Sequence, residues 1–288
     1  MSHAIIAQNI MQVTLTQAQM SKGMQPCYNV AIPNADLNTV QKNLIKKIQE
    51  NNKVKFIEQD MELQFLGLVK KELTNDSINI YCLIIQKDTL IEINMFVESD
   101  SVFFKPNEDK TDLASDKIDN SIRNYLLSFA NEQYRLVVKK DLDAQENLLA
   151  NKQDELEKLV KEEENLKKEN ASLENDIDEY EREVTEIEKN IEAKNDEITK
   201  HTLFMQTIVL EEDKKAAEDN HKDLEKEKKQ LVKDRGKAKD DISSSKSKIE
   251  KNNKTINENL ELQEQKKLEI ESQQEVVLQV QKKLEGIK

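Results

Sequence analysis

The stretch LENDIDEYEREVTEIEKNIEAKNDEI, residues 173–198, carries apolar side chains at alternating intervals of four and three residues, and most residues between them are charged. This spacing is typical of a helix that packs along another helix in a coiled coil. The same register covers 142–208, and its apolar positions are Leu142, Leu149, Leu156, Leu159, Leu166, Leu173, Ile177, Tyr180, Val184, Ile187, Ile191, Ile198, Met205 and Ile208. A second register covers 221–287 and is out of frame with the first by two residues, which a single insertion of three or four residues does not explain.

A reversal of chain direction explains the change of frame, because the two segments, 142–208 and 221–287, are nearly equal in length. We therefore predict a long antiparallel coiled-coil hairpin over 141–288, with its tip at 209–220. Setting Leu142 opposite Ile287 gives these facing pairs: Leu159 with Ile270, Leu173 with Ile256, Tyr180 with Ile249, Ile187 with Ile242, Ile198 with Leu231, Met205 with Leu224, Glu163 with Lys266, and Asn170 with Asn259. The same alignment sets Lys194 opposite Arg235 and His201 opposite Lys228, so a slip of one heptad stays open. A parallel homodimeric rod is the alternative.

Residues 9–140 predict a small α+β domain with a mostly antiparallel sheet. Strands are expected at 9–16, 28–32, 54–57, 63–69, 78–85, 90–97 and 102–104, separated by turns rich in Asn, Asp and Ser. Asn34 or Asp36 is expected to cap a helix after Pro33. A second helix, starting near Thr111 or Asp112, continues without a break into the coil. Ten of the twelve aromatic residues precede residue 141, so the globular core belongs to this half.

The first eight residues, MSHAIIAQ, have the form of a signal-peptide remnant, with Ala7 before and Gln8 after a cleavage point, although the basic start and long apolar core of a full signal are missing. The alternative is the ordinary start of a first strand. The sequence has no run of about twenty apolar residues, so no direct membrane span is expected.

The negative charge is concentrated in the coil. Residues 1–140 carry 16 basic and 17 acidic side chains, whereas the remaining residues carry 28 and 40, which leaves the coil at −12 of the total −13. Because such a surface repels phosphate, nucleic-acid binding and docking on an anionic membrane are disfavoured.

The sequence contains no motif that indicates catalysis, and it predicts no enzyme, no cofactor and no metal site. Cys27 and Cys82 lie on or beside expected strands, either as two buried thiols, which free cysteines commonly are, or as a disulfide. His201 and His221 flank the expected tip, but their spacing matches no established metal motif. Glycine-rich phosphate loops and Ser/His/Asp arrangements are absent from the sequence.

Two fragments carry a resemblance to a known group. The ending QQEVVLQVQKKL, 273–284, and the segment LSFAN, 127–131, before a coil are similar to uncharacterised exported proteins of Bacteroidota. That resemblance implies a small α+β domain followed by a charged helical hairpin, and a periplasmic or cell-envelope location rather than a cytoplasmic one.

One apolar run, residues 203–210, interrupts the polar coil. Its apolar members are Leu203, Phe204, Met205, Ile208, Val209 and Leu210. They either seal the turn of the hairpin or form a docking patch, since clustered exposed apolar residues usually mark an interaction site. The expected function is therefore a non-enzymatic structural or interaction protein in the cell envelope, in which a rigid coiled-coil arm docks or spaces a protein partner or self-associates. The alternative is a holdase-like periplasmic chaperone that uses the coil and the apolar tip.

Overall fold

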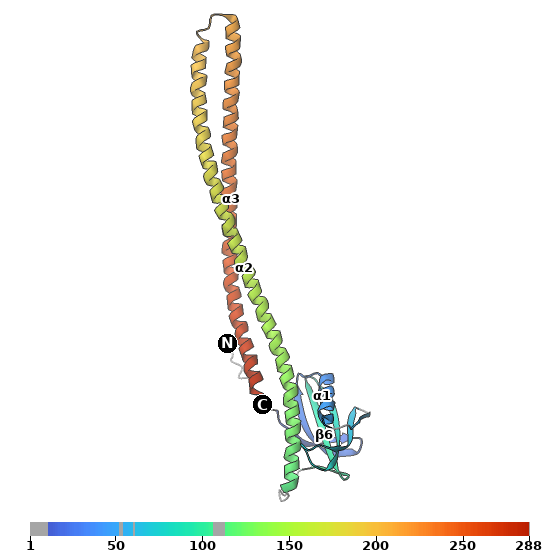
Figure 1. Ribbon diagram of the computed structural model, residues 1–288. Coiled ribbons are helices and arrows are strands. Elements are labelled where there is room, and N and C mark those ends of the chain that lie inside the picture. The colour runs from blue at the N-terminus through green and yellow to red at the C-terminus, as the bar shows by residue number, and fades with distance from the viewer. Residues whose placement is uncertain (1–10, 52–53, 60, 106–112, 288) are drawn as a thin grey trace. The chain divides into compact units, whose positions relative to one another are not determined.

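The computed structural model describes residues 11–51, 54–59, 61–105 and 113–287, so the expected signal remnant, 1–8, lies outside the described residues. The chain divides into two compact units. The first contains the described residues up to Leu149 together with those from Gln273 onward, and the second is Ala150–Ser272. Figure 1 shows an α+β unit and a long helical hairpin, as the sequence predicts.

A seven-stranded antiparallel sheet forms the centre of the first unit. Its strands are β1 (Thr14–Met20), β2 (Gly23–Pro33), β3 (Phe56–Gln59), β4 (Glu62–Val69), β5 (Ser77–Lys87), β6 (Leu90–Ser99) and β7 (Val102–Phe103). Their spatial order is β1-β2-β6-β5-β4-β3, and β7 pairs with β6. The strands from β3 to β7 therefore form the expected meander, and β2 joins it by pairing with β6.

The first strand lies later in the sequence than predicted. Residues 9 and 10 of the expected strand are outside the described part, and the observed strand runs from Thr14 to Met20. Its position follows from the two-residue turn before Gly23, which sets Met20 opposite Gly23 and Thr14 opposite Asn29. Most β1 side chains are exposed, so backbone pairing rather than apolar alternation determines where the strand lies.

One face of the sheet carries the main apolar core. Helix α1 (Leu37–Gln49) buries Val40, Leu44 and Ile48 there, and the Asp36 carboxylate caps the helix by accepting a hydrogen bond from the Thr39 N–H. Helix α2 (Leu113–Met205) adds Ile122, Leu126 and Phe129 from its first turns. The expected helix start at Thr111 or Asp112 falls outside the described residues.

The turn between β1 and β2 reaches across the other face of the sheet. The Ser21 N–H and hydroxyl both donate to the Glu62 carboxylate on β4, at 2.9 and 2.6 Å, although β6 and β5 lie between β2 and β4. Met20, Cys27, Tyr81 and Phe96 form a small second core on this face. Cys27 and Cys82 lie in different cores and are free buried thiols, which confirms the thiol interpretation over the disulfide.

The second unit, Ala150–Ser272, consists of the later part of α2, the turn, and the earlier part of α3 (Glu211–Gly286), and the two helices run antiparallel (Figure 1). The hairpin prediction is confirmed, because the two helices that pack along the seam belong to one chain. Helix α2 is continuous from Leu113 to Met205, so the expected unbroken passage from the α+β unit into the coil is also confirmed. The parallel rod does not describe this chain.

The alignment that sets Leu142 opposite Ile287 is wrong by one heptad. Asn170 bonds with Asn252, seven residues before the expected Asn259, and His201 faces His221, seven residues before the expected Lys228. Counting along the antiparallel seam from Asn170 and Asn252, Tyr180 faces Ile242. Lys266, expected opposite Glu163, instead pairs with Glu155 at 2.8 Å.

Two features determine the observed register. Ile287 is buried in the main core of the α+β unit, and its carbonyl accepts a hydrogen bond from Arg135, so the end of α3 reaches seven residues beyond Leu142. At the other end, the turn occupies 206–210 rather than 209–220, because α3 already begins at Glu211. Three acidic side chains in the first turn of α3, Glu211, Glu212 and Asp213, favour a helix start there.

Candidate functional site at the hairpin tip

The turn that joins α2 to α3 spans 206–210 and is held mainly by its own backbone. The Gln206 and Thr207 N–H groups donate to the carbonyls of Leu203 and Phe204, and the Thr207 hydroxyl donates to the Phe204 carbonyl at 2.8 Å. The Leu210 carbonyl accepts from the Lys214 N–H and so opens α3. The turn therefore needs no apolar plug to keep its shape.

The six apolar residues singled out from the sequence divide into two groups. Leu203, Phe204, Val209 and Leu210 are 60%, 57%, 95% and 68% exposed, whereas Met205 and Ile208 are half-buried. Four of the six thus face solvent, two of them in the last turn of α2 and two within the 206–210 turn. We call these four residues the tip patch. The interpretation of the run as a seal fits only Met205 and Ile208.

Beneath the tip patch the seam is polar and titratable. The His201 and His221 rings lie 5.7 Å apart between centroids, and the His201 ring contacts Phe204 edge-on at 6.1 Å. One heptad before His201, Lys194 pairs with Glu197 at 2.7 Å and with Glu227 at 2.9 Å. The lysine is thereby neutralised at a position that an apolar residue would usually occupy.

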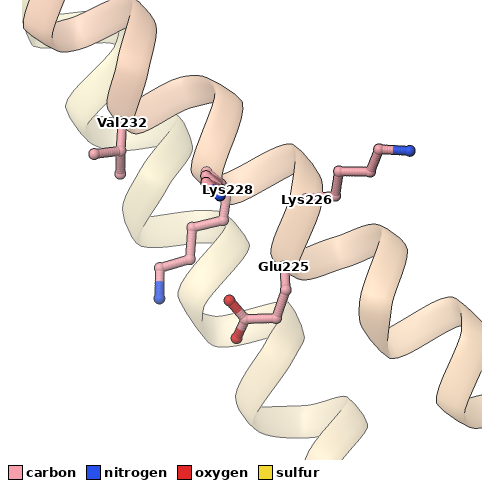
Figure 2. Close-up of a pocket in the computed structure, with 5 residues that line it drawn as sticks. Glu225, Lys226, Lys228 and Val232 are labelled. Atoms are coloured by element: carbon pink, nitrogen blue, oxygen red, sulfur yellow. The ribbon is translucent and has the colours of Figure 1, made fainter.

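Two shallow depressions lie on this end of the hairpin. One has a volume of about 360 Å³ and is lined by Glu197, Lys200, His201, Phe204, Asn220 and Leu224. The other has a volume of about 440 Å³ and is lined by Glu225, Lys226, Lys228, Lys229 and Val232. Figure 2 shows Glu225 and Lys228 extending over the neighbouring helix, while Lys226 points the other way. Long, mixed-charge side chains of this kind are suited to contact a protein surface rather than to enclose a small molecule.

The most elaborate polar cluster lies in the α+β unit, around Glu98. Its carboxylate accepts hydrogen bonds from Lys22 at 2.7 and 2.8 Å, Asn79 at 2.9 Å and Tyr81 at 2.9 Å. Burial alone would raise the pKa of Glu98, but these hydrogen bonds and the Lys22 charge outweigh it and leave the pKa below its ordinary value. Every partner is engaged in holding the β1–β2 turn to β5 and β6, so the cluster stabilises the fold.

The two thiols are poorly suited to nucleophilic chemistry. Burial raises the pKa of Cys27 to about 11, and burial together with the Glu62 carboxylate also raises the pKa of Cys82. Because the thiolate is the nucleophile, both groups are inert at neutral pH.

A larger groove, of about 860 Å³, runs between α1 and α2. Lys42, Lys46 and Lys47 approach it from α1, and Glu132, Arg135 and Leu136 from α2. Lys47 pairs with Glu132 at 2.9 Å, and Arg135 donates to the Ile287 carbonyl. Much of the charge that lines the groove is therefore already paired within the unit.

Sequence reasoning located the tip patch but missed two arrangements. The Glu98 cluster depends on the β1–β2 turn crossing the sheet, and the facing histidines depend on the register of the hairpin. His201 and His221 each continue the three-and-four spacing of their helix, which places both in the seam. An alignment shifted by one heptad from the predicted one sets the two histidines opposite each other.

Among the described residues, no three or more His, Cys, Asp or Glu side chains converge as metal ligands, and no helix is long and apolar enough to cross a membrane. No protein-family model, no curated protein and no solved structure matches the chain.

Proposed function

We propose that this chain is a non-enzymatic structural or interaction protein in which a helical hairpin presents the tip patch to a protein partner, for docking or for spacing. The observation that carries the proposal is the exposure of Leu203, Phe204, Val209 and Leu210 at the end of α2 and in the turn that follows, whose backbone is already hydrogen-bonded. Apolar side chains that neither seal the turn nor pack in the seam are best explained by a surface that covers them.

The energy available at such a surface supports the proposal. Fully burying one large apolar side chain contributes about 1.5–3 kcal/mol. Phe204 and the three aliphatic residues of the tip patch begin more than half exposed, so a partner that covers them gains several kcal/mol. Interfaces commonly concentrate their energy in a few aromatic or large apolar anchors, which makes Phe204 the first candidate anchor.

The polar groups of the α+β unit support a non-enzymatic role. Glu62 is held by Ser21, Glu98 by Lys22, and the side-chain Oδ1 of Asn94 accepts from Asn29 at 2.8 Å. These buried polar side chains are committed to one another. Acidic, basic and nucleophilic groups that converge on a cavity would favour an enzyme instead.

The test compares partner capture by the intact protein, by Phe204→Asp/Leu210→Asp, and by a control, Leu260→Asp/Leu268→Asp. The control replaces two exposed leucines on α3 that are 41% and 66% exposed, so it adds the same charge outside the tip. We expect the tip variant to lose a stoichiometric partner at least tenfold in quantitative cross-linking from the native cell, and the control to keep it. Equal recovery by all three proteins would contradict the proposal. Far-ultraviolet circular dichroism checks that helicity is unchanged.

The same exposed patch also favours a second candidate, a holdase-like chaperone. A holdase would bind many unfolded clients and suppress the aggregation of a heat-unfolded test enzyme, and the tip variant would lose that suppression. A docking protein would give one partner at fixed stoichiometry and no suppression. Light scattering with a test enzyme therefore separates the two functions.

A further inference from the structure

We propose that His201 and His221 form a two-histidine site that binds a divalent transition-metal ion across the hairpin, one helical turn below the tip patch. The two side chains come from different helices, His201 from α2 and His221 from α3. Their ring centroids are 5.7 Å apart and their planes differ by 32°.

The spacing of the rings fits a shared ion. With metal–nitrogen distances of about 2.0–2.1 Å, two imidazoles on one ion in tetrahedral or slightly wider geometry place their centroids about 5–6 Å apart. The observed separation lies within that interval without any movement of the helices.

The nitrogen atoms supply an independent reason. The Nδ1 atoms of His201 and His221 are both buried without a hydrogen-bond partner, and in the described part of the chain only the Tyr125 hydroxyl shares that condition. Leaving a buried polar atom unpaired destabilises the folded state, so such atoms usually have a water molecule or an ion as partner. Here two of them occur on facing side chains.

The surroundings allow a cation. One heptad before His201, the seam lysine Lys194 is neutralised by Glu197 and Glu227, and Glu197 also lines the depression beside His201. Lys228, which the same register sets opposite Lys194, adds a positive charge on α3. Lys200 lines the same depression and contributes one opposing charge. Because no third His, Cys, Asp or Glu completes the group within the described residues, solvent would fill the remaining coordination positions.

The chemistry of the site selects the class of ion. Neutral imidazole suits Ni²⁺, Cu²⁺ and Zn²⁺, whereas Mg²⁺ and Ca²⁺ prefer oxygen ligands. A site with two protein ligands and bound solvent exchanges its ion readily and joins the two helices only when the ion is present. Binding would therefore order the end of the hairpin, since the ion links one helix to the other.

The experiment titrates Ni²⁺ and Cu²⁺ into the full chain by calorimetry at neutral pH, with His3→Asn in every sample so that only two histidines remain. The variants are His201→Asn, His221→Asn and the double replacement, and Asn220→Ala, which lines the same depression, is the control. We expect one ion per chain, dissociation constants raised at least tenfold by either single replacement, and no change in the control. The many carboxylates of the acidic surface bind ions equally in all samples, so the difference between samples isolates the pair.

Two further readouts do not depend on the replacements leaving the seam intact. Copper electron paramagnetic resonance of the unaltered pair should show coupling to two imidazole nitrogens, and hydrogen exchange of 201–221 should slow at least fivefold with Ni²⁺. Coupling to one nitrogen only, affinities equal in the double variant, or exchange unaffected by the ion would each overturn the proposal and leave water as the partner of the two nitrogens. Calcium and magnesium at the same concentrations should have no effect.

Discussion

Replacing Asn170 with alanine is expected to destabilise the hairpin because Asn170 lies in its seam. Asn170 is 8% exposed, donates to the side-chain Oδ1 of Asn253 at 2.8 Å and accepts from the side-chain amide of Asn252 at 2.9 Å. Asn252 is also 8% exposed, so it loses a partner that water does not readily replace. Its remaining contact, to Glu169 at 3.3 Å, is long.

The magnitude follows from these contacts. Leaving one buried amide partly unpaired costs about 1–3 kcal/mol, and the surviving contact to Glu169 places Asn170→Ala near 1–2 kcal/mol. Alanine gains about 0.5 kcal/mol of helix propensity over asparagine at either a buried or an exposed position. The matched control is therefore Asn165→Ala, five residues earlier on the same helix and exposed, which should be neutral or slightly stabilising.

The assay is urea unfolding followed by circular dichroism at the helical minimum. With a slope of about 2–3 kcal/mol per molar urea, the Asn170→Ala midpoint should fall by about 0.5 M relative to Asn165→Ala. Replacing Asn170 and Asn252 together by leucine should instead raise the midpoint, because an apolar pair fills the seam and no amide is stranded. Equal midpoints for the two alanine variants would refute the assignment of a buried polar layer.

Three other predictions concern the register, the polar cluster and the sheet. In a background without native cysteines, the Leu173→Cys/Ile249→Cys pair should oxidise to an internally linked monomer faster than the Tyr180→Cys/Ile249→Cys pair. The reason is the register: Ile249 lies three residues before Asn252 and therefore faces Leu173. Equal oxidation rates, followed on a denaturing gel, would reject this register. The pKa of Glu98 is lowered in the folded protein, so Glu98 contributes to the free energy of unfolding above its unfolded pKa of about 4.5, and this contribution disappears as pH falls through the folded pKa. Glu98→Gln should therefore weaken the fall of the melting temperature at acid pH. An unchanged dependence of melting temperature on pH would contradict the stabilising role of the Glu98 cluster. Gly67 lies in β4 where the pairing with β5 shifts register between Phe65 and Leu68. Its φ is 70°, and nothing lies within 4 Å of an added Cβ, so Gly67→Ala should cost about 1 kcal/mol from the backbone conformation alone; an unchanged melting temperature would show that this irregularity relaxes.

The secondary structure was largely predictable because local chemistry determines it. The expected cap at Asp36 and the expected strands at 78–85 and 90–97 all correspond to observed elements. The first strand was misplaced because its residues are mostly polar and exposed, so no apolar pattern identifies them. Pairing with β2 determines β1, and that pairing depends on an element elsewhere in the chain.

The hairpin was predictable as a topology but not in its register. Seven-residue periodicity repeats itself, so a shift by one heptad keeps apolar residues in the seam and changes only which ones meet. The deciding contacts are few: Asn170 with Asn252, and Ile287 within the α+β core. The second of these joins residues far apart in sequence, which seam periodicity does not encode.

Most of the candidate site could be located from sequence, since an apolar run in a polar helix is a local feature. Its division into exposed and half-buried residues was not predictable, because it depends on where the turn begins. The turn at 206–210 ends α2 at Met205 and leaves Val209 and Leu210 exposed next to the start of α3, whereas the predicted first arm continued to Ile208.

The burial of Ile287 in the core of the α+β unit affects how this protein is synthesised. Ile287 packs in the same core as Ile122 and Tyr134, yet about 150 residues are translated between Tyr134 and Ile287. At about 5–20 residues per second, the ribosome needs on the order of ten seconds to make that stretch. During this interval, the surface that Val280, Leu284 and Ile287 will cover stays open to solvent and to chaperones. The nascent α+β unit thus acquires its last core contacts only after the whole hairpin has been translated.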